Sequence, residues 1–370
     1  MDVLPAGALE DGAGTALAQW RRNEAILTRR RWALTLAALG IASVIMLVLC
    51  SQFGAASIAF TDMLFAVIRL VQTGQLDASS IGTPGVIFLQ VRLPRVLMAF
   101  LVGGSLAAVG VTLQALLRNP LADPYVLGVS SGAALGAALA MLLGVASTAL
   151  WLPLLPVWGF IGGLLALALI YHAAQSRGRL PIHSLLLAGV ILNAILTAII
   201  MFVTSIMEPA RSAGFMTWLM GALAGPSLGN LAVTASYVVV VGAVLFRYAP
   251  VLNVLTQGEE VARSLGVDTE RTKKQLYVLT ALLTGAVVSV SGMIGFIGMV
   301  VPHAVRLVIG TDHRLLMPAS ALAGGMFLVM SDTVARTVLA PAEIPVGIVT
   351  ALAGGPFFLS LLLRQKDRMV

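Results

Sequence analysis

Charge is scarce in this chain of 370 residues: only 11% of the residues are Asp, Glu, Lys or Arg, whereas 59% are hydrophobic and the mean hydropathy is +0.97. A water-soluble core cannot hide that much apolar surface, so the composition excludes a soluble globular protein. The apolar residues form continuous runs of about 18 to 22 residues, not the ten-residue alternating segments of a membrane barrel. The sequence therefore predicts an all-α polytopic membrane protein.

Cysteine and lysine are also rare, with one cysteine, Cys50, and three lysines in the whole chain. A lone cysteine excludes an intrachain disulfide and a cysteine-based metal site, and no H-E-x-x-H metal motif occurs. No Gly-Lys pair occurs, so the chain cannot form a phosphate-binding loop. We therefore expect no metal, no cofactor and no catalytic residue in this chain, which is not predicted to be an enzyme. If nucleotide hydrolysis drives this protein, another subunit must supply it.

Ten apolar runs are candidate transmembrane helices: 32–50, 96–117, 126–143, 150–171, 184–206, 231–246, 276–294, 296–309, 315–334 and 344–363. The eighth is short and has Pro302 at its centre. With both termini in the cytoplasm, all but five of the 23 lysines and arginines lie on the cytoplasmic side, as the positive-inside rule requires. The net charge of +7 is thus expected to set topology and not to bind nucleic acid. The five external residues are Arg69, Arg92, Arg95, Arg211 and Arg336.

The chain divides into a polar cytoplasmic extension, 1–31, and one transmembrane domain, 32–370. The first apolar run is longer than the apolar region of a signal peptide, so we expect it to be retained, although Gly54-Ala55-Ala56 resembles a cleavage site. The largest cytoplasmic segment is about 247–275. A short interfacial helix is expected around Phe215 to Met220.

An internal echo suggests an inverted repeat of spans two to five and seven to ten. Gly103 and Gly110 bracket six residues in the second span, as Gly285 and Gly292 do in the seventh. These spans enter the membrane from opposite sides in the predicted topology. A repeat of this kind is typical of transporters.

Two other functional classes have some support in the sequence. Residues 128–132, GVSSG, match the G-x-S-x-G pattern of serine hydrolases, but no strand precedes them and no His and Asp partners can be located. Small residues in a membrane helix favour close packing instead. An ion-coupled transporter would need an ionisable group near mid-membrane, and the candidates are Asp332 near an outer end and His303 and Arg306 in the short eighth span. Ion-coupled secondary transport is kept as the less favoured alternative.

The cytoplasmic segment contains a motif that is typical of a contact with another protein. Residues 258–266, GEEVARSLG, predict a short polar helix that is ended by a glycine. A solvated linker would not need a compact capped helix that carries Val261, Ala262 and Leu265. We therefore predict that this helix docks onto another protein.

Several motifs in order carry a resemblance to a known family. They are RLPR at 92–95, QALLRNPLADPYVLGVSSGA at 114–133, LLLAGV at 185–190, the EEVARSLG helix, GFIGMVVPHAVR at 295–306, GTDHR at 310–314 and EIPVGIVTALAGGPFF at 343–358. Together they resemble the FecCD family, the permease subunits of ABC importers for cobalamin, ferric siderophores and haem. The resemblance covers about residues 85–365.

The resemblance implies a fold and a set of partners. The fold is that of a type II ABC importer, a homodimer with ten transmembrane helices per subunit in the bacterial inner membrane. Two cytoplasmic ATPase subunits would bind ATP and Mg²⁺, and a soluble periplasmic binding protein would deliver the cargo. No nucleic acid partner is implied.

The resemblance also implies roles for individual residues. Docking of the binding protein is implied for the external residues Arg92, Arg95 and Arg336, whose guanidinium groups we expect to be exposed for acidic partners. The cytoplasmic gate would comprise Asn119, Leu121, Pro181 and Ile182. ATPase coupling would fall to Glu259, Glu260, Ala262, Arg263, Leu265 and Gly266.

The cargo is the least determined part of the prediction. Haem is the first choice, and His303 and His313 along the expected exit route could offer iron ligands, although they discriminate little between cargoes. The same motifs also occur in relatives that carry other cargo. The apolar pair Pro181 and Ile182 departs from the small hydroxyl residues of the cobalamin permease, which weakens cobalamin. Ferric siderophore and cobalamin remain open alternatives.

Overall fold

The computed structural model describes residues 28–366, except 55–56, 75–77, 146–147, 150–151, 177–179, 224 and 226. Most of the predicted extension 1–31 therefore lies outside the described residues. The helices are α2 (Arg29–Gln52), α3 (Phe60–Thr73), α4 (Ala78–Val86), η1 (Ile87–Arg92), α5 (Leu93–Leu117), η2 (Pro124–Leu127), α6 (Val129–Leu142), α7 (Leu154–Ala174), α8 (Ile182–Ser205), α9 (Pro209–Leu219), α10 (Leu228–Phe246), α11 (Ala249–Leu255), α12 (Glu259–Ser264), α13 (Thr269–Ser291), α14 (Ile297–Ile309), α15 (His313–Thr337) and α16 (Val346–Lys366). Among the described residues, the strands are the antiparallel pair β1 (Thr148–Ala149) and β2 (Leu152–Pro153).

The all-α prediction is confirmed, and each of the ten predicted spans coincides with a helix. In the described part of the chain, seven helices are long and apolar enough to cross a membrane, and α6, α14 and α16 are shorter apolar helices. The count of ten crossings and the inverted repeat stay predictions. The glycine echo does not reflect equivalent roles: Gly110 packs against another helix, whereas Gly292 ends α13 with φ 68°.

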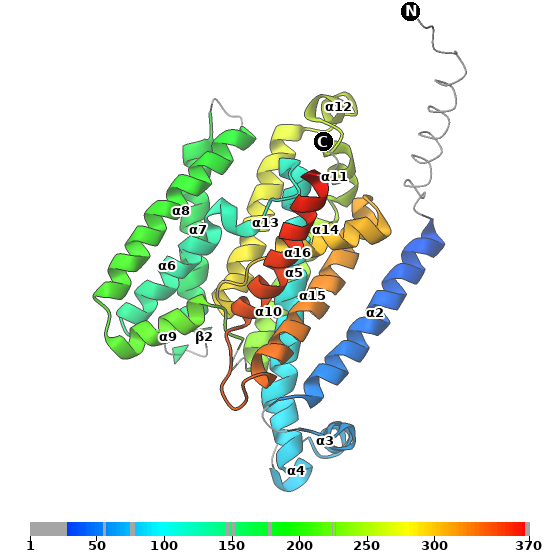
Figure 1. The fold of residues 1–370 in the computed structure, drawn as a ribbon, viewed down its shortest axis with the longest axis vertical. Coiled ribbons are helices and arrows are strands. Elements are labelled where there is room, and N and C mark those ends of the chain that lie inside the picture. The colour runs from blue at the N-terminus through cyan, green and yellow to red at the C-terminus, as the bar shows by residue number, and fades with distance from the viewer. Residues whose placement is uncertain are drawn as a thin grey trace, which may run out of the picture.

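Helix α5 is the buried centre of the bundle (Figure 1). Of the most apolar 18 residues in the segment Ser80–Leu117, which ends with α5, 83% are buried, whereas only 11% are buried in the corresponding stretch of α2. A Cβ atom on Gly103 would collide with the carbonyl oxygen of Gly324 in α15, and one on Gly110 would collide with that of Gly298 in α14. Backbones that approach this closely gain the van der Waals contact that holds helices together in lipid.

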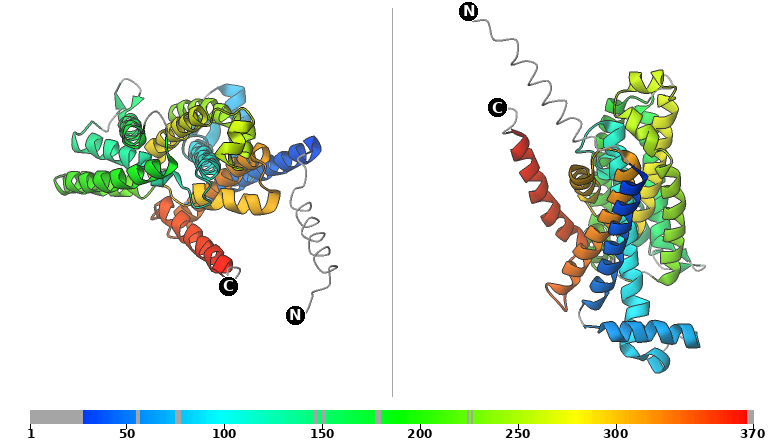
Figure 2. Two further views of the ribbon diagram at one scale, coloured as in Figure 1. Left: turned by 90° about the horizontal axis from the view of Figure 1, so that it is seen from above. Right: turned by 90° about the vertical axis from the view of Figure 1, so that its right-hand side faces the viewer.

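The two ends of the bundle differ. Helix α12 lies at one end, together with α11 and the chain entering α15, whereas α3 and α4 lie at the other end and extend to one side (Figures 1 and 2). Helix α16 leans away from the rest of the bundle (Figure 2). By the predicted topology, the α12 end is cytoplasmic and the α3 end is external.

The segment between the first two spans is more structured than the external loop that the sequence predicted. It folds into α3, α4 and the π-helical turn η1, which runs directly into α5. The expected interfacial helix is present as α9, but its Phe215 and Trp218 are buried against the α6 region instead of facing an interface. The prediction of an interfacial position is therefore wrong for these two side chains.

Candidate functional site

Three arginines that sequence analysis expected to be exposed at the external end are mostly buried there. Only 5% of the surface of Arg92 and of Arg336 is exposed. Arg92 Nη1 donates to the carbonyl oxygens of Ser51 and Gln52 at 3.1 and 2.8 Å, and Arg336 Nη2 donates to that of Cys50 at 2.7 Å. These carbonyls belong to the last turn of α2, where a helix has no acceptor partners of its own and carries partial negative charge. The expected exposure is therefore wrong for both residues.

Arg95 joins this group through carboxylates. Its Nε and Nη2 atoms donate to Asp332 Oδ1 at 3.0 and 2.9 Å, and its Nη1 atom pairs with Glu343 Oε2 at 2.9 Å. The Arg95 side chain is 12% exposed, Asp332 is 1% exposed and Glu343 is 49% exposed. Asp332 also lies 3.4 Å from Arg336 Nε. We call Arg92, Arg95, Asp332, Arg336 and Glu343 the outer charge cluster; only its Glu343 side chain is largely open to solvent.

At the opposite end, the elbow between α5 and η2 is shaped by side-chain caps. Arg118 ends α5 in the left-handed region with φ 47°. The Asn119 carboxamide accepts the backbone N–H of Leu121 at 2.9 Å, and the Asp123 carboxylate accepts that of Tyr125 at 2.8 Å. Such short loops are typical of Asn and Asp, whose side chains replace backbone turns. Asn119 and Leu121, the first half of the predicted gate, are exposed.

Burial gives Asp123 an unusual ionisation. Removal from water raises the pKa of its carboxyl group to about 6, and the hydrogen bond from Tyr125 opposes this only in part. Tyr125, two residues on, accepts the backbone N–H of Ile294 through its hydroxyl group and so ties the elbow to the end of α13. The elbow is therefore anchored to the segment that follows α13.

Pro181, from the second half of the predicted gate, lines a cavity together with the end of α5. It forms the N-cap of α8. A cavity of about 510 Å³ is lined by Leu117, Arg118, Pro181, His183, Glu259, Arg263, Glu270 and Lys273. The structure therefore brings the end of the elbow helix, the start of α8 and two predicted coupling residues, Glu259 and Arg263, around one space. The side chain of Ile182 lies outside the described part of the structure.

The helix predicted to couple to an ATPase has the expected form. In α12, the N–H of Val267 donates to Ala262 O at 3.0 Å and that of Gly266 donates to Arg263 O at 2.9 Å, with Gly266 at φ 85°. This is the Schellman pattern, which ends a helix on a glycine. Glu260, Arg263 and Leu265 are exposed, but Ala262 is fully buried and faces the bundle. Ala262 therefore packs α12 against its own chain and does not present a contact surface.

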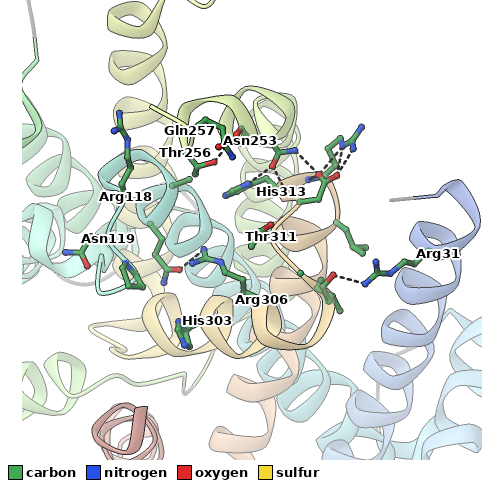
Figure 3. Close-up of a pocket in the computed structure, with 18 residues that line it drawn as sticks. Arg31, Arg118, Asn119, Asn253, Thr256, Gln257, His303, Arg306, Thr311 and His313 are labelled. Atoms are coloured by element: carbon green, nitrogen blue, oxygen red, sulfur yellow. Dashed lines mark hydrogen bonds and ion pairs between the residues drawn. The ribbon is translucent and has the colours of Figure 1, made fainter. Parts of the chain in front are cut away.

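A larger polar cavity of about 750 Å³ opens between the ends of α5, α11, α14 and the start of α15 (Figure 3). We call it the basic cavity, because four arginines line it with a single carboxylate, Asp312. Arg118 and Asn119 lie on one side of it and Arg31 on the other (Figure 3). The cavity also contains both predicted cargo contacts, His303 and His313.

Asn253 fixes the orientation of His313. Its Oδ1 atom accepts both the backbone N–H of His313 at 2.8 Å and the ring Nδ1 at 2.7 Å, while its Nδ2 donates to Asp312 at 2.9 Å. The ring therefore carries a proton on Nδ1, and in the neutral imidazole this leaves Nε2 as an acceptor. Asp312 is itself held by Arg314; although burial opposes ionisation, these hydrogen bonds lower the pKa of Asp312 to about 2.

Gln114 was missed by sequence analysis, yet it joins α5 to α14. Pro302 lacks the N–H that would bind the carbonyl oxygen of Gly298, four residues earlier. Gln114 Nε2 donates to the carbonyl oxygens of Gly298 and Met299 at 3.3 and 3.1 Å, and its Oε1 accepts from Arg306 in the basic cavity at 3.1 Å. The signal in the sequence was Pro302 itself, because a proline inside a helix leaves a carbonyl oxygen that needs a hydrogen-bond donor from elsewhere.

The contacts of the described residues do not support the serine hydrolase or the ion-coupled transporter. Ser131 hydrogen-bonds to Asn193 of α8, and Gly132 faces Gly162 of α7 at contact distance, so the GVSSG segment serves packing. Asp332 is paired with arginines. Across the part of the chain that the structure describes, no group of three or more His, Cys, Asp or Glu side chains is placed to hold a metal ion.

Comparisons with known proteins agree with the motifs. The hemin transport system permease protein HmuU of Yersinia pestis is 44% identical over 283 residues, which cover 75% of this chain and 83% of that protein. The cobalamin import system permease protein BtuC of Halobacterium salinarum is 47% identical over 286 residues, which cover 76% of this chain and 73% of that protein.

Solved structures show the same fold. An inward-facing transporter described as of the metal-chelate ABC type matches with a TM-score of 0.75 and 31% identity, covering 90% of this chain and 99% of that one. The model of the FecCD transport family matches residues 35–364. This chain therefore belongs to the FecCD transport family.

Proposed function

We propose that this chain is the membrane permease subunit of an ATP-driven ABC importer and moves an iron-bearing chelate, haem in the first instance, from the periplasm to the cytoplasm. Two copies form the permease, two cytoplasmic subunits bind ATP and Mg²⁺, and a periplasmic protein delivers the cargo. The complex lies in the inner membrane of a bacterium with both termini of this chain in the cytoplasm.

One observation carries the mechanism. Pro181 of the expected gate and two residues expected to receive force from an ATPase, Glu259 and Arg263, surround the same 510 Å³ cavity at one end of the bundle. A movement of α12 therefore has a short route to the start of α8 and to the elbow after α5. Alternating access requires such a connection, because the energy source lies outside this chain.

The outer charge cluster supports docking in a form that differs from the sequence prediction. Arg92 and Arg336 hold the end of α2, so they shape the docking surface from beneath. Arg95 and the exposed Glu343 are the members that a carboxylate of the binding protein can approach. Docking then exchanges one carboxylate partner of Arg95 for another.

The basic cavity supports an anionic cargo. Arg118 and Arg306 supply positive charge on its walls, and Asp312, its one carboxylate, is already paired with Arg314. Haem carries two carboxylates and an iron atom that imidazole binds, which suits His303 at the same place. The His313 ring is held by Asn253 and only 3% of the residue is exposed, so it must turn outward before it can bind iron. Ferric siderophore and cobalamin remain the alternative cargoes, because relatives of similar identity are named for hemin and for cobalamin.

Reconstitution tests the proposal. The permease, its ATPase and its binding protein are placed in liposomes, and ATP-dependent uptake of haem, cobalamin and a ferric siderophore is measured in parallel. We expect haem uptake that stops when ATP is omitted. Uptake of cobalamin or siderophore in place of haem would overturn the cargo assignment alone. Accumulation by the purified chain under a proton gradient, without ATPase, would overturn the ABC mechanism and favour an ion-coupled transporter.

A further inference from the structure

A chain of polar contacts leads from the coupling helix α12 to the first turn of α8. Glu259, the first residue of α12, accepts from Lys273 Nζ at 3.2 Å. Lys273 Nζ also pairs with Glu270 at 2.7 Å, and Glu270 Oε2 accepts the backbone N–H of Leu180 at 2.9 Å. The next residue, Pro181, is the N-cap of α8. We call these four contact points, Glu259, Lys273, Glu270 and the Leu180 N–H, the α12–α8 relay.

We propose that the α12–α8 relay is the link that moves the start of α8 when α12 is displaced, with Lys273 as its central positioning residue. This inference rests on the proposed function, because it needs an ATPase partner to act on α12. It adds to that function the side chains that carry the movement.

Burial makes Lys273 suited to this role. Its side chain is only 6% exposed, whereas lysine side chains are almost never buried unless they are paired. Its two carboxylate partners are 27% and 26% exposed, so the ammonium group lies beneath both and holds them together. Without the ammonium group, the two carboxylates would share only the half-exposed Arg263, at 3.3 Å from Glu259 and 3.8 Å from Glu270, and an ion pair that open to solvent contributes little.

The end of the relay is fixed by backbone chemistry. Pro181 has no N–H, so the Leu180 N–H is the last backbone donor before α8, and α8 has no side-chain cap of its own. Leu180 is buried, and the ring of Pro181 fixes its own φ, at −66°, and restricts the backbone of Leu180 before it. A displacement of Glu270 therefore reaches α8 through two stiff residues.

Helix α12 has few other attachments to the bundle among the described contacts. Buried Ala262 packs inward, and Arg263 Nε donates to Thr269 Oγ1 at 2.9 Å at the start of α13. The remaining side chains of α12 are largely exposed. Force applied to its exposed face therefore passes chiefly through Glu259 and Arg263. Both branches reach Glu270: Glu259 through the buried Lys273, and Arg263 through its half-exposed Nη2 atom, which lies 3.8 Å from Glu270 Oε1.

The first test compares transport with ATP hydrolysis in the reconstituted complex. We expect Lys273→Met to keep assembly and basal ATPase activity but to lower the number of cargo molecules moved per ATP by at least tenfold. Lys273→Arg should restore most of that ratio, because it keeps the positive charge between the carboxylates. Lys274→Met, the same change one residue along α13, is the matched control and should leave the ratio within twofold of wild type.

A second pair of variants covers a failure of Lys273→Met to assemble. Glu270→Gln keeps an oxygen that accepts the Leu180 N–H, whereas Glu270→Met removes it. The relay requires a larger fall in transport per ATP for Glu270→Met than for Glu270→Gln. Equal ratios in these two variants, or a wild-type ratio in assembled Lys273→Met, overturn the relay.

A distance measurement separates a mechanical role from a purely structural one. With Cys50 replaced by serine, spin labels at Ser264 in α12 and His183 in α8 report the separation of the two elements with and without trapped nucleotide. The relay predicts one narrow distance in both states of the wild type and a broadened, state-dependent distance in Lys273→Met. A wild-type distance that changes with nucleotide overturns the relay. A wild-type complex that neither hydrolyses ATP nor transports any tested cargo overturns the proposed function, and the relay with it.

Discussion

Arg95 and Asp332 form a buried ion pair in which both Nε and Nη2 of the arginine donate to a single carboxylate oxygen, Oδ1, at 3.0 and 2.9 Å. The second oxygen of Asp332 lies 3.4 Å from Arg336 Nε, so one buried carboxylate balances two guanidinium groups. This relationship organises the external end of the bundle, because Arg336 in turn holds the last turn of α2.

Loss of the Asp332 charge is expected to be costly. Asp332→Asn leaves Arg95 and Arg336 facing each other with little solvent, and removal of one partner of a buried ion pair destabilises a protein by about 3 to 5 kcal/mol. Glu343→Gln removes a half-exposed partner of the same Arg95, for which about 0 to 1 kcal/mol is expected. Thermal unfolding of the purified protein in detergent should show a much larger fall in midpoint for Asp332→Asn. Similar falls for both variants would contradict the buried role of Asp332.

The same pair of carboxylates gives a test of docking. If the binding protein presents a carboxylate to Arg95, it competes with Glu343, so Glu343→Gln should tighten binding by about two- to fivefold, in line with the small worth of an exposed ion pair. Arg95→Gln should weaken binding. Affinity is measured with the permease in nanodiscs and labelled binding protein, at low and at high salt. An affinity that ignores both changes would remove Arg95 from the docking surface.

Gln114 should contribute to the stability of the folded protein, although it is a single polar residue in an apolar helix. Gln114→Leu preserves volume but leaves the Gly298 carbonyl oxygen and the Arg306 guanidinium without those partners, at a cost of about 1 to 3 kcal/mol. Thr112→Val, two residues earlier in α5, is the control: the Thr112 hydroxyl bonds only to Ala108 of its own helix in the described contacts. The thermal midpoint should fall clearly for Gln114→Leu and little for Thr112→Val. The reverse order would mean that Gln114 does not support the helix at Pro302.

Two glycines in helices make a matched pair for the packing of α5. A Cβ atom on Gly110 meets the carbonyl oxygen of Gly298, whereas one on Gly40 in α2 meets nothing within 4 Å. Gly110→Ala should force α5 and α14 apart and cost about 1 to 3 kcal/mol, as overpacking does. Gly40→Ala should be neutral or stabilise by about 0.5 to 1 kcal/mol, because alanine favours a helix. Thermal unfolding of the two variants checks both signs, and destabilisation by Gly40→Ala would contradict the open surroundings of that residue.

Sequence reasoning recovered the helices because apolar runs and helix-ending glycines are local signals. Gly266 ends α12 as predicted, since a left-handed residue and two backbone hydrogen bonds need only neighbours in the chain. The exposure of Arg92 and Arg336 was predicted wrongly for the opposite reason. A charge count assigns a side of the membrane, but it cannot show that the carbonyl oxygens of residues 50–52, distant in sequence, lie within reach of those guanidinium groups.

The relay shows a second limit of the sequence. Lys273 and Glu270 are three residues apart on α13, which a helix brings to one face, so their pairing was open to prediction. Their contacts with Glu259 and with the Leu180 N–H depend on how α12 and the loop before α8 fold back onto α13. Sequence analysis predicted the gate and the coupling helix as separate motifs but had no means to join them.

Asp123 should make the elbow sensitive to pH. Its pKa of about 6 in the folded chain lies above the ordinary value of about 3.9, so the folded state binds the proton more tightly than the unfolded state does. The contribution of Asp123 to stability is therefore greatest below about pH 4, falls as the pH rises to about 6, and is constant above that. Because the side chain is partly exposed, the total change is expected to be about 1 to 3 kcal/mol.

Asp123→Asn isolates this effect, because the amide oxygen still accepts the Tyr125 N–H while the titrating proton is gone. The thermal midpoint of the variant should match that of the wild type near pH 4 and exceed it near pH 8. Subtracting one curve from the other cancels the contribution of all other titrating groups. The remaining difference should develop between about pH 4 and pH 6. Parallel curves across that range would mean that the Asp123 carboxyl group is already ionised in the folded protein at low pH, and that the elbow does not respond to protons.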